Sequence, residues 1–162
     1  QKIIFEIPYF FSMKNGHKIM PTSYFMILLV LSICTHFLFP IKEILYPPFT
    51  YFGFLLIIAG LLLNLWTDWL FKKVNTTVKP FNDPKVLLTS GPFRISRHPM
   101  YLGMTSILLG AAIFLGTIIT FLFPIIFVIL IELLFIPFEE KNLDRIFSLE
   151  YSDYKKNVRR WI

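Results

Sequence analysis

The chain has 162 residues, of which 56% are hydrophobic, 18% aromatic and 16% charged. Soluble domains carry about 25% charged residues, so this composition excludes a disordered segment and argues against a soluble domain. The single cysteine, Cys34, excludes an intrachain disulfide and a cysteine-rich metal site. We therefore expect a membrane protein without a metal centre.

Three long stretches of the chain lack Lys, Arg, Asp and Glu: residues 19–41, 44–67 and 98–131. About 20 residues of helix cross the hydrocarbon core of a bilayer. The third stretch is too long for one such helix, and Gly116 and Thr117 offer a turn within it. The sequence therefore predicts one all-α membrane domain, 1–162, with four transmembrane helices at about 22–39, 49–71, 100–115 and 118–136.

The basic residues give this prediction a topology. With four spans, fifteen of the sixteen Lys and Arg residues fall on one side of the membrane, and only Lys42 falls on the other. Lys and Arg concentrate in cytoplasmic loops, so both termini, the loop 72–98 and the C-terminal segment 137–162 are predicted to be cytoplasmic. The net charge of +6 is then explained by topology and anionic lipid headgroups, and we expect no nucleic acid partner.

The C-terminal segment is predicted to be an amphipathic cytoplasmic helix. Its apolar residues recur at spacings of three and four, which is typical of one helix face. They are Leu143, Ile146, Phe147, Tyr151, Tyr154 and Val158.

The start of the third predicted span combines several polar residues. Pro99 suits the first turn of a helix, because the N–H that it lacks would be unpaired there. The other free N–H groups, together with Arg94 and Arg97, would suit a carboxylate or phosphate. Taken singly, each of these residues also has an ordinary role, since arginines and aromatic residues are common where helices leave a membrane.

Three glutamates mark the fourth predicted span and its end. Glu139 and Glu140 would lie at the negative end of a helix dipole, so we expect Arg97, His98 or a bound cation to compensate them, unless water solvates both. Glu132 lies inside the span, where an ionisable group costs about 2.5 to 3.5 kcal/mol and is a functional candidate by default. It precedes Glu139 by seven residues, which predicts nearly the same helix face.

Residues 60–162 resemble the isoprenylcysteine carboxyl methyltransferase and phospholipid methyltransferase superfamily. The resemblance rests on the stretch from Leu88 to Gly103, with its Arg97-His98-Pro99-Met100-Tyr101, then on Glu139-Glu140 and on the tyrosines and Arg159-Arg160-Trp161 that follow. It implies a membrane methyltransferase that uses S-adenosyl-L-methionine and acts on a lipophilic or lipid-like acceptor at the cytoplasmic face. It also implies cofactor contacts at Lys85, Val86, Leu87, Leu88, Phe93, His98, Pro99, Met100, Tyr101 and Glu139.

Other residues bear on the identity of the methyl acceptor and on the removal of its proton. An amine or thiol acceptor must lose a proton, and Glu132 and Glu140 are the catalytic candidates, with His98 also available. Carboxyl methyltransferases have an arginine where this chain has Phe135, which argues against a prenylcysteine carboxylate as acceptor. Two smaller departures from the family pattern are Phe93 in place of a tyrosine and Ser148 in place of a glycine.

Two other functions are compatible with the sequence. The C-terminal region is distantly similar to sterol reductases, so an NADPH-dependent membrane reductase is one alternative, although those proteins usually have more spans. A membrane scaffold or sensor that retains the pocket without catalysis is the other. Protection against thermal unfolding by NADPH or by the methyl donor would separate the first alternative, and a radiolabelled methyl-transfer assay would separate the second.

Overall fold

The computed structural model describes residues 20–39, 42–74 and 84–162, so most of the N-terminal 21 residues and part of the loop 72–98 lie outside the described residues. Over these ranges the fold is all-α, as the composition predicts, with only an isolated bridge between Glu43 and Thr117. The α-helices are α2 (Pro21–Leu38), α3 (Phe52–Lys73), α4 (Pro99–Leu115), α5 (Leu122–Leu130) and α6 (Ile136–Asn157). The shorter elements are the 3₁₀-helices η1 (Phe49–Tyr51), η2 (Gly91–Arg94) and η3 (Ile118–Phe121), and the π-helix η4 (Ile131–Phe135).

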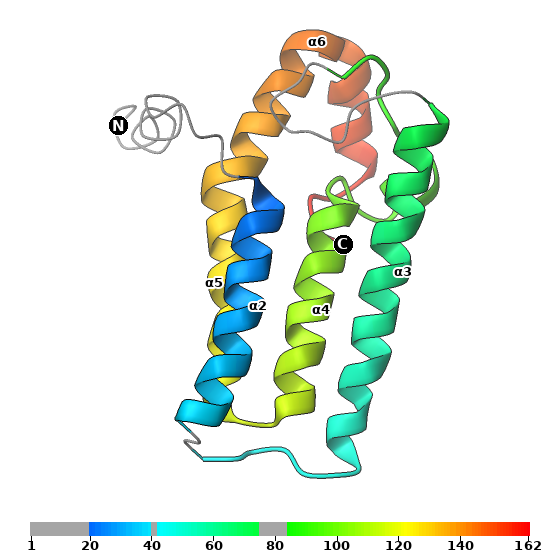
Figure 1. The fold of residues 1–162 in the computed structure, drawn as a ribbon. Helices are drawn as coiled ribbons and strands as arrows, with labels where there is room; N and C mark the ends of the chain where they lie inside the picture. The colour runs from blue at the N-terminus through cyan, green and yellow to red at the C-terminus, as the bar shows by residue number, and fades with distance from the viewer. Residues whose placement is uncertain (1–19, 40–41, 75–83) are drawn as a thin grey trace.

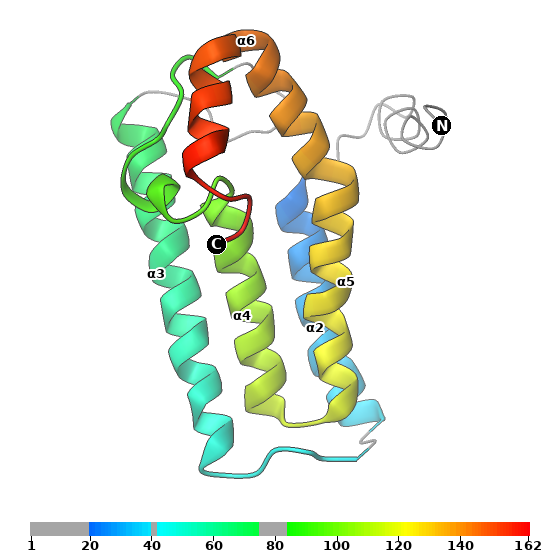
Figure 2. The ribbon, with the colours of Figure 1, turned by 180° about the vertical axis from the view of Figure 1, so that it is seen from behind.

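The long helices form a bundle in which successive helices run in opposite directions (Figure 1). The start of α2, the end of α3, the start of α4 and the whole of α6 lie at one end. Figure 2 shows the same bundle from behind, with the last residues descending from α6 towards the start of α4. The polar segments at this end are therefore far apart in sequence and close in space.

Three helical stretches are long and apolar enough to cross a membrane: Pro21–Leu38, Phe49–Lys73 and Ile118–Asn157. The remaining predicted span, the third at about 100–115, corresponds to α4, which is apolar but has 17 residues. Large apolar side chains on α3 point out of the bundle, among them Leu62, Leu65 and Trp69, each about half exposed or more. Such a surface suits lipid rather than water, so the chain is a membrane protein.

Glycines allow α3 and α4 to pack closely. A Cβ atom placed on Gly60 would lie 2.5 Å from the carbonyl oxygen of Gly103, and one on Gly53 would lie 2.4 Å from that of Gly110. Gly53 and Gly60 are seven residues apart on α3, and Gly103 and Gly110 are seven residues apart on α4. Both close approaches therefore fall on the same face of each helix. Small residues of this kind let helix backbones meet within a membrane. The contact fixes the start of α4 against α3.

The turn predicted at Gly116 and Thr117 is confirmed. Gly116 has φ 71°, a left-handed conformation that ends α4 and that glycine adopts without a steric cost. Its carbonyl accepts hydrogen bonds from the N–H groups of Ile44, at 2.8 Å, and Leu45, at 3.2 Å. This end of the bundle is thereby closed by backbone contacts between two connecting loops.

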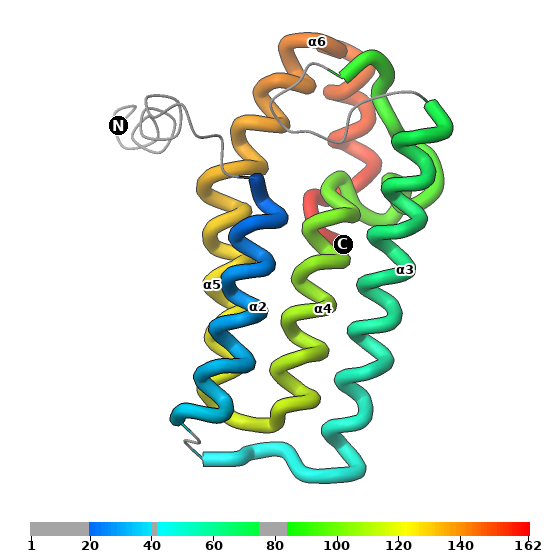
Figure 3. Tube along the Cα trace, viewed as in Figure 1, coloured from blue at the N-terminus to red at the C-terminus, as the bar shows by residue number. Residues whose placement is uncertain are grey.

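The fourth span and the C-terminal helix form one rod rather than two separate helices. The chain stays helical from Leu122 through η4 into α6, with Pro137 in the first turn of α6 (Figure 3). Ser148, with φ 42° and ψ −107°, then breaks α6 into two halves. This backbone conformation favours glycine, which is the residue that the resemblance described above implies at this position. The second half folds back, and its Tyr151 and Tyr154 pack with Leu88 and Phe93.

Candidate functional site

The loop before α4 is held against the second half of α6. The Tyr154 hydroxyl donates a hydrogen bond to the carbonyl oxygen of Phe93 at 2.6 Å, and Phe93 packs edge-on against Phe71 of α3 at 5.6 Å between ring centroids. Tyr151 is fully buried in the same cluster. The predicted amphipathic face therefore packs on this loop and fixes its course towards α4.

His98 immediately precedes α4 and is 6% exposed. Its backbone, with φ −126° and ψ 61°, is neither helical nor fully extended, and its N–H donates to the Ser96 hydroxyl oxygen at 3.1 Å. No side chain in the described part of the chain caps the N-terminus of α4. The first N–H groups of this helix, at Met100 and Tyr101, therefore face the polar end of the bundle without a side-chain acceptor.

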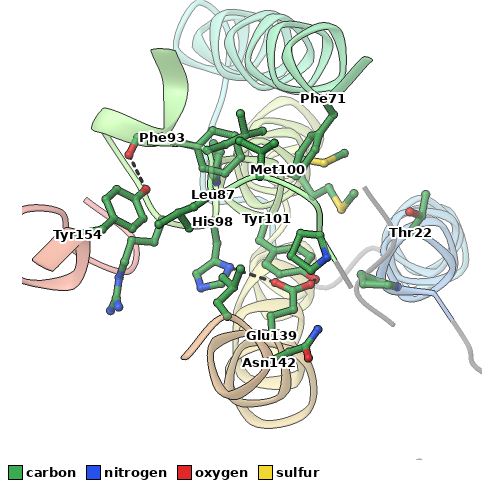
Figure 4. Close-up of a pocket in the computed structure, with 18 of the residues that line it drawn as sticks. Thr22, Phe71, Leu87, Phe93, His98, Met100, Tyr101, Glu139, Asn142 and Tyr154 are labelled. Carbon is green, nitrogen blue, oxygen red and sulfur yellow. Dashed lines mark hydrogen bonds and ion pairs between the residues drawn. The ribbon is translucent and has the colours of Figure 1, made fainter. Parts of the chain in front are cut away.

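Glu139 joins α6 to the start of α4. The Tyr101 hydroxyl donates to one of its oxygens, and His98 Nδ1 lies 3.2 Å from the other. The rings of His98 and Tyr101 are stacked, with 17° between their planes. Figure 4 shows the three side chains meeting at one edge of a cavity. The chain thus brings together residues that lie 38 positions apart in sequence.

Glu140 is surrounded by cationic groups. Arg160 donates to both of its oxygens, at 2.6 and 3.1 Å. Arg97 Nη2 lies 3.2 Å from the carboxylate, and His98 Nε2 lies 3.5 Å from it. The expectation that Arg97 and His98 compensate the two glutamates is confirmed, and Arg160 is a further partner that sequence reasoning missed. The sequence pointed to these last residues only because Arg159-Arg160-Trp161 is part of the family resemblance, which gave Arg160 no specific role.

The charges in this cluster shift the pKa values of Glu140 and His98 in opposite directions. Burial alone would raise the pKa of Glu140, but hydrogen bonds from His98 and Arg160 and the charge of Arg97 lower it to about 2. Burial would lower the pKa of His98, and the hydrogen bonds and charges of Glu139 and Glu140 outweigh it, so this pKa is raised. Glu140 is therefore a carboxylate across the physiological range, and His98 takes up a proton more readily than an isolated histidine.

A cavity of about 280 Å³ opens beside this cluster. Nine of the ten predicted cofactor-binding residues line it: Val86, Leu87, Leu88, Phe93, His98, Pro99, Met100, Tyr101 and Glu139. The tenth, Lys85, is exposed and does not line it. Sequence reasoning missed the contribution of the start of α2, because no motif marks it: Met20, just before the helix, and Pro21 and Thr22 in its first turn also line the cavity. The role of all these residues in cofactor binding remains a prediction.

The two predicted catalytic glutamates lie outside the cavity lining. Glu132 accepts hydrogen bonds from Arg160 and, at 3.0 Å, from Trp161 Nε1. The expectation that Glu132 shares a face with Glu139 is wrong: Arg160 brings Glu132 together with Glu140 instead. The π-helix η4 is the reason, because each residue in its wider turn advances less around the helix axis. Among the described residues no cluster of His, Cys, Asp or Glu could hold a metal ion.

Comparison with known proteins shows the family to which the chain belongs. A family model described as "Phospholipid methyltransferase" matches residues 49–150, which include α3, the loop, α4 and both glutamates of the cluster. An uncharacterized protein of Haemophilus influenzae is 41% identical over 63 residues, which are 39% of this chain and all of that protein. No solved structure matches. On this evidence the chain belongs to the phospholipid methyltransferase family of membrane methyltransferases.

Proposed function

We propose that this protein transfers a methyl group from S-adenosyl-L-methionine to a lipophilic or lipid-like acceptor at the cytoplasmic face of the membrane. The observation that carries the proposal is the cavity at the polar end of an apolar bundle, where a paired carboxylate and an uncapped helix start share one wall. A soluble cofactor and a membrane-dissolved acceptor could meet at such a boundary.

The residues of the cavity fit the cofactor in charge and in shape. Glu139 would take its ammonium group or ribose hydroxyls, because a carboxylate accepts hydrogen bonds from both. The free N–H groups at the start of α4 would take its carboxylate. Phe93 and the neighbouring Leu87 and Leu88 offer an apolar surface for the adenine ring.

The acceptor is proposed to be a lipid-like molecule without a carboxylate at the reacting position. The cavity reaches Pro21 of α2 and Met104 of α4, both on apolar helices. Phe135, which stands where carboxyl methyltransferases have an arginine, is 5% exposed and packs edge-on against Tyr24. It brings no positive charge to this part of the bundle.

The protein's own contribution to the reaction is alignment and the exclusion of water. S-adenosyl-L-methionine supplies a methyl group that is already activated on a sulfonium. The buried His98 and Tyr101 and the partly buried Glu139 would hold the donor in one orientation within an apolar cavity. The catalytic role of Glu132 and Glu140 stays a prediction, and the low pKa of Glu140 makes it a weak proton acceptor.

We further propose that α4 also crosses the membrane, which gives four transmembrane helices, and that both termini are cytoplasmic. Seventeen residues of helix span about 25 Å, which is close to the thickness of the hydrocarbon core. The alternating directions of α2, α3, α4 and the α5–α6 rod support this topology, as do the basic residues.

Calorimetric titration of S-adenosylhomocysteine into detergent-purified protein tests the cofactor site. We expect His98→Ala and Glu139→Ala each to weaken binding by about tenfold or more, since the first removes a buried polar partner and the second a partly buried carboxylate. Glu150→Gln is the matched control, because it removes an exposed charge from the same helix. Wild-type affinity in both alanine variants would contradict the assignment, and thermal protection by NADPH instead would favour the reductase.

A further inference from the structure

The last five residues, 158–162, form a C-terminal tail that lies against the bundle. Val158 ends α6 in an extended conformation, with φ −127° and ψ 129°. The tail then runs back towards the start of α4 (Figure 2). Its only charged side chains are those of Arg159 and Arg160, and the second of these is the one that contacts the helices.

Arg160 joins two turns of the α5–α6 rod. Its guanidinium donates to both oxygens of Glu140 in α6 and also to Glu132 in η4. Trp161 adds a hydrogen bond from its indole N–H to the second oxygen of Glu132, at 3.0 Å. A planar guanidinium can serve two carboxylates in this way, whereas a lysine ammonium cannot reproduce the paired geometry.

The backbone of the tail holds the loop on the other side of the cluster. The carbonyl oxygen of Arg160 accepts a hydrogen bond from the Ser96 hydroxyl at 3.0 Å, and that hydroxyl accepts from the N–H of His98. The carbonyl oxygen of Arg159 accepts from the N–H of Arg97 at 3.1 Å. The tail therefore ties the loop that carries His98 to the rod that carries Glu140.

None of Arg160, Glu132 and Ser96 lines the cavity. They can affect the cavity only through Glu140 and His98. Glu140 lies beside His98, and His98 lines the cavity. Glu140 Oε1 is shared between Arg160 Nε, Arg97 Nη2 and His98 Nε2, so the position of this oxygen depends on the arginine that grips both oxygens.

We propose that Arg160 is a positioning residue, which holds Glu140 against His98 from outside the cavity and thereby fixes one wall of the site. The inference rests on the proposed function as far as the identity of the ligand is concerned. The positioning itself concerns only this chain's residues. Without Arg160, Glu140 keeps Arg97 and His98 as contacts of Oε1 and loses the contact that holds Oε2, so its carboxylate can turn away from His98.

The test compares Arg160→Gln with Arg159→Gln in the full-length protein. The two variants remove the same charge from neighbouring positions, and the Arg159 side chain is exposed. S-adenosylhomocysteine is the probe for binding. We expect its affinity to fall about tenfold in Arg160→Gln, as for the loss of one charge-assisted hydrogen bond, and to stay within about twofold in Arg159→Gln.

A second readout needs no ligand. Selective labelling of histidine rings allows His98 to be titrated by NMR in wild type and in Arg160→Gln. Arg97, Glu139, Glu140 and Tyr101 face His98, and Glu139 and Glu140 raise its pKa. If Arg160 positions Glu140, its removal lowers the pKa of His98, because one of these carboxylates moves away.

The outcomes separate this inference from the proposed function. An unchanged or raised pKa of His98 in Arg160→Gln would overturn the positioning role, whatever the ligand. A lowered pKa without any binding of S-adenosylhomocysteine by the wild type would support the positioning role and refute the proposed cofactor. If Arg160→Gln does not fold, Arg160→Lys takes its place, and wild-type values in that variant would overturn the need for a paired guanidinium.

Discussion

At the scale of single residues, the site is a chain of charges whose members depend on one another. Glu139 holds Tyr101 and His98, His98 lies between Glu139 and Glu140, and Glu140 is held by two arginines. A buried charge is stable only when it is paired, so removing one member leaves its partner exposed to the full cost of burial. The sequence motif around His98 made Arg97, His98 and Tyr101 predictable as members of this cluster. Arg160 was not, because no spacing rule connects an extended tail to a helix twenty residues earlier.

The raised pKa of His98 predicts how stability depends on pH. The group gains protons on folding, so its contribution is complete below its unfolded pKa of 6.5 and is lost as the pH rises through the higher folded value. We expect the melting temperature of the wild type to fall as the pH is raised from about 6 to about 9. Differential scanning fluorimetry in detergent measures this directly.

His98→Gln is the variant that isolates the effect, and His36→Gln is its control at the opposite end of the bundle. His98→Gln should melt at a lower temperature than the wild type near pH 6, and its melting temperature should depend less on pH. His36→Gln should keep the pH dependence of the wild type. An equal slope in wild type and His98→Gln would show that another group is responsible.

At the scale of elements, two local departures from regular helix position the site. The π-helix η4 turns Glu132 towards Arg160, and Ser148 folds the second half of α6 onto the loop. The helices themselves, the turn at Gly116 and the amphipathic face could be predicted from charge-free runs and periodicity. The π-helix could not, because a sequence pattern assumes 3.6 residues per turn and Glu132 was placed on the wrong face for that reason. The sequence already showed a serine at position 148 in place of the expected glycine. That the helix bends there follows only from the backbone angles of Ser148.

Ser148 predicts a stabilising substitution. A residue with a Cβ atom is strained at φ 42°, by about 1 to 3 kcal/mol, whereas glycine adopts this region freely. We expect Ser148→Gly to increase the free energy of unfolding by about 1 kcal/mol, after the larger entropy loss of glycine on folding is included. Thermal unfolding in detergent measures the change.

Ser152→Gly provides the matched control, because Ser152 lies in regular helix four residues later. There glycine should destabilise the protein by about 0.5 kcal/mol, through its lower helix propensity. A loss of stability in both variants would mean that the bend at Ser148 is not strained.

At the scale of the whole molecule, charge and apolar surface are separated along the bundle. The end with α6 carries the cavity, the glutamate cluster and the arginines, whereas the opposite end is closed by backbone contacts around Gly116 and carries Lys42. This partition could be predicted from the positions of charged residues alone, because burial in lipid forbids unpaired charges over most of the chain. The walls of the cavity could not be predicted in full, because the residues that α2 contributes to the lining belong to no sequence motif.

The proposed topology predicts which loops a reagent can reach from outside the cell. Cys34 is the only cysteine, so a Cys34→Ser background allows single cysteines to be placed at Glu43, beside the turn at Gly116, or at Glu150, on α6. In intact cells, a membrane-impermeant maleimide should label Glu43→Cys and leave Glu150→Cys unlabelled until the membrane is permeabilised. Both side chains are exposed, so accessibility within the protein is matched. Labelling of both from outside would contradict the odd number of spans, three, between them, and the reverse pattern would place the cavity on the outer face, away from the cytoplasmic methyl donor.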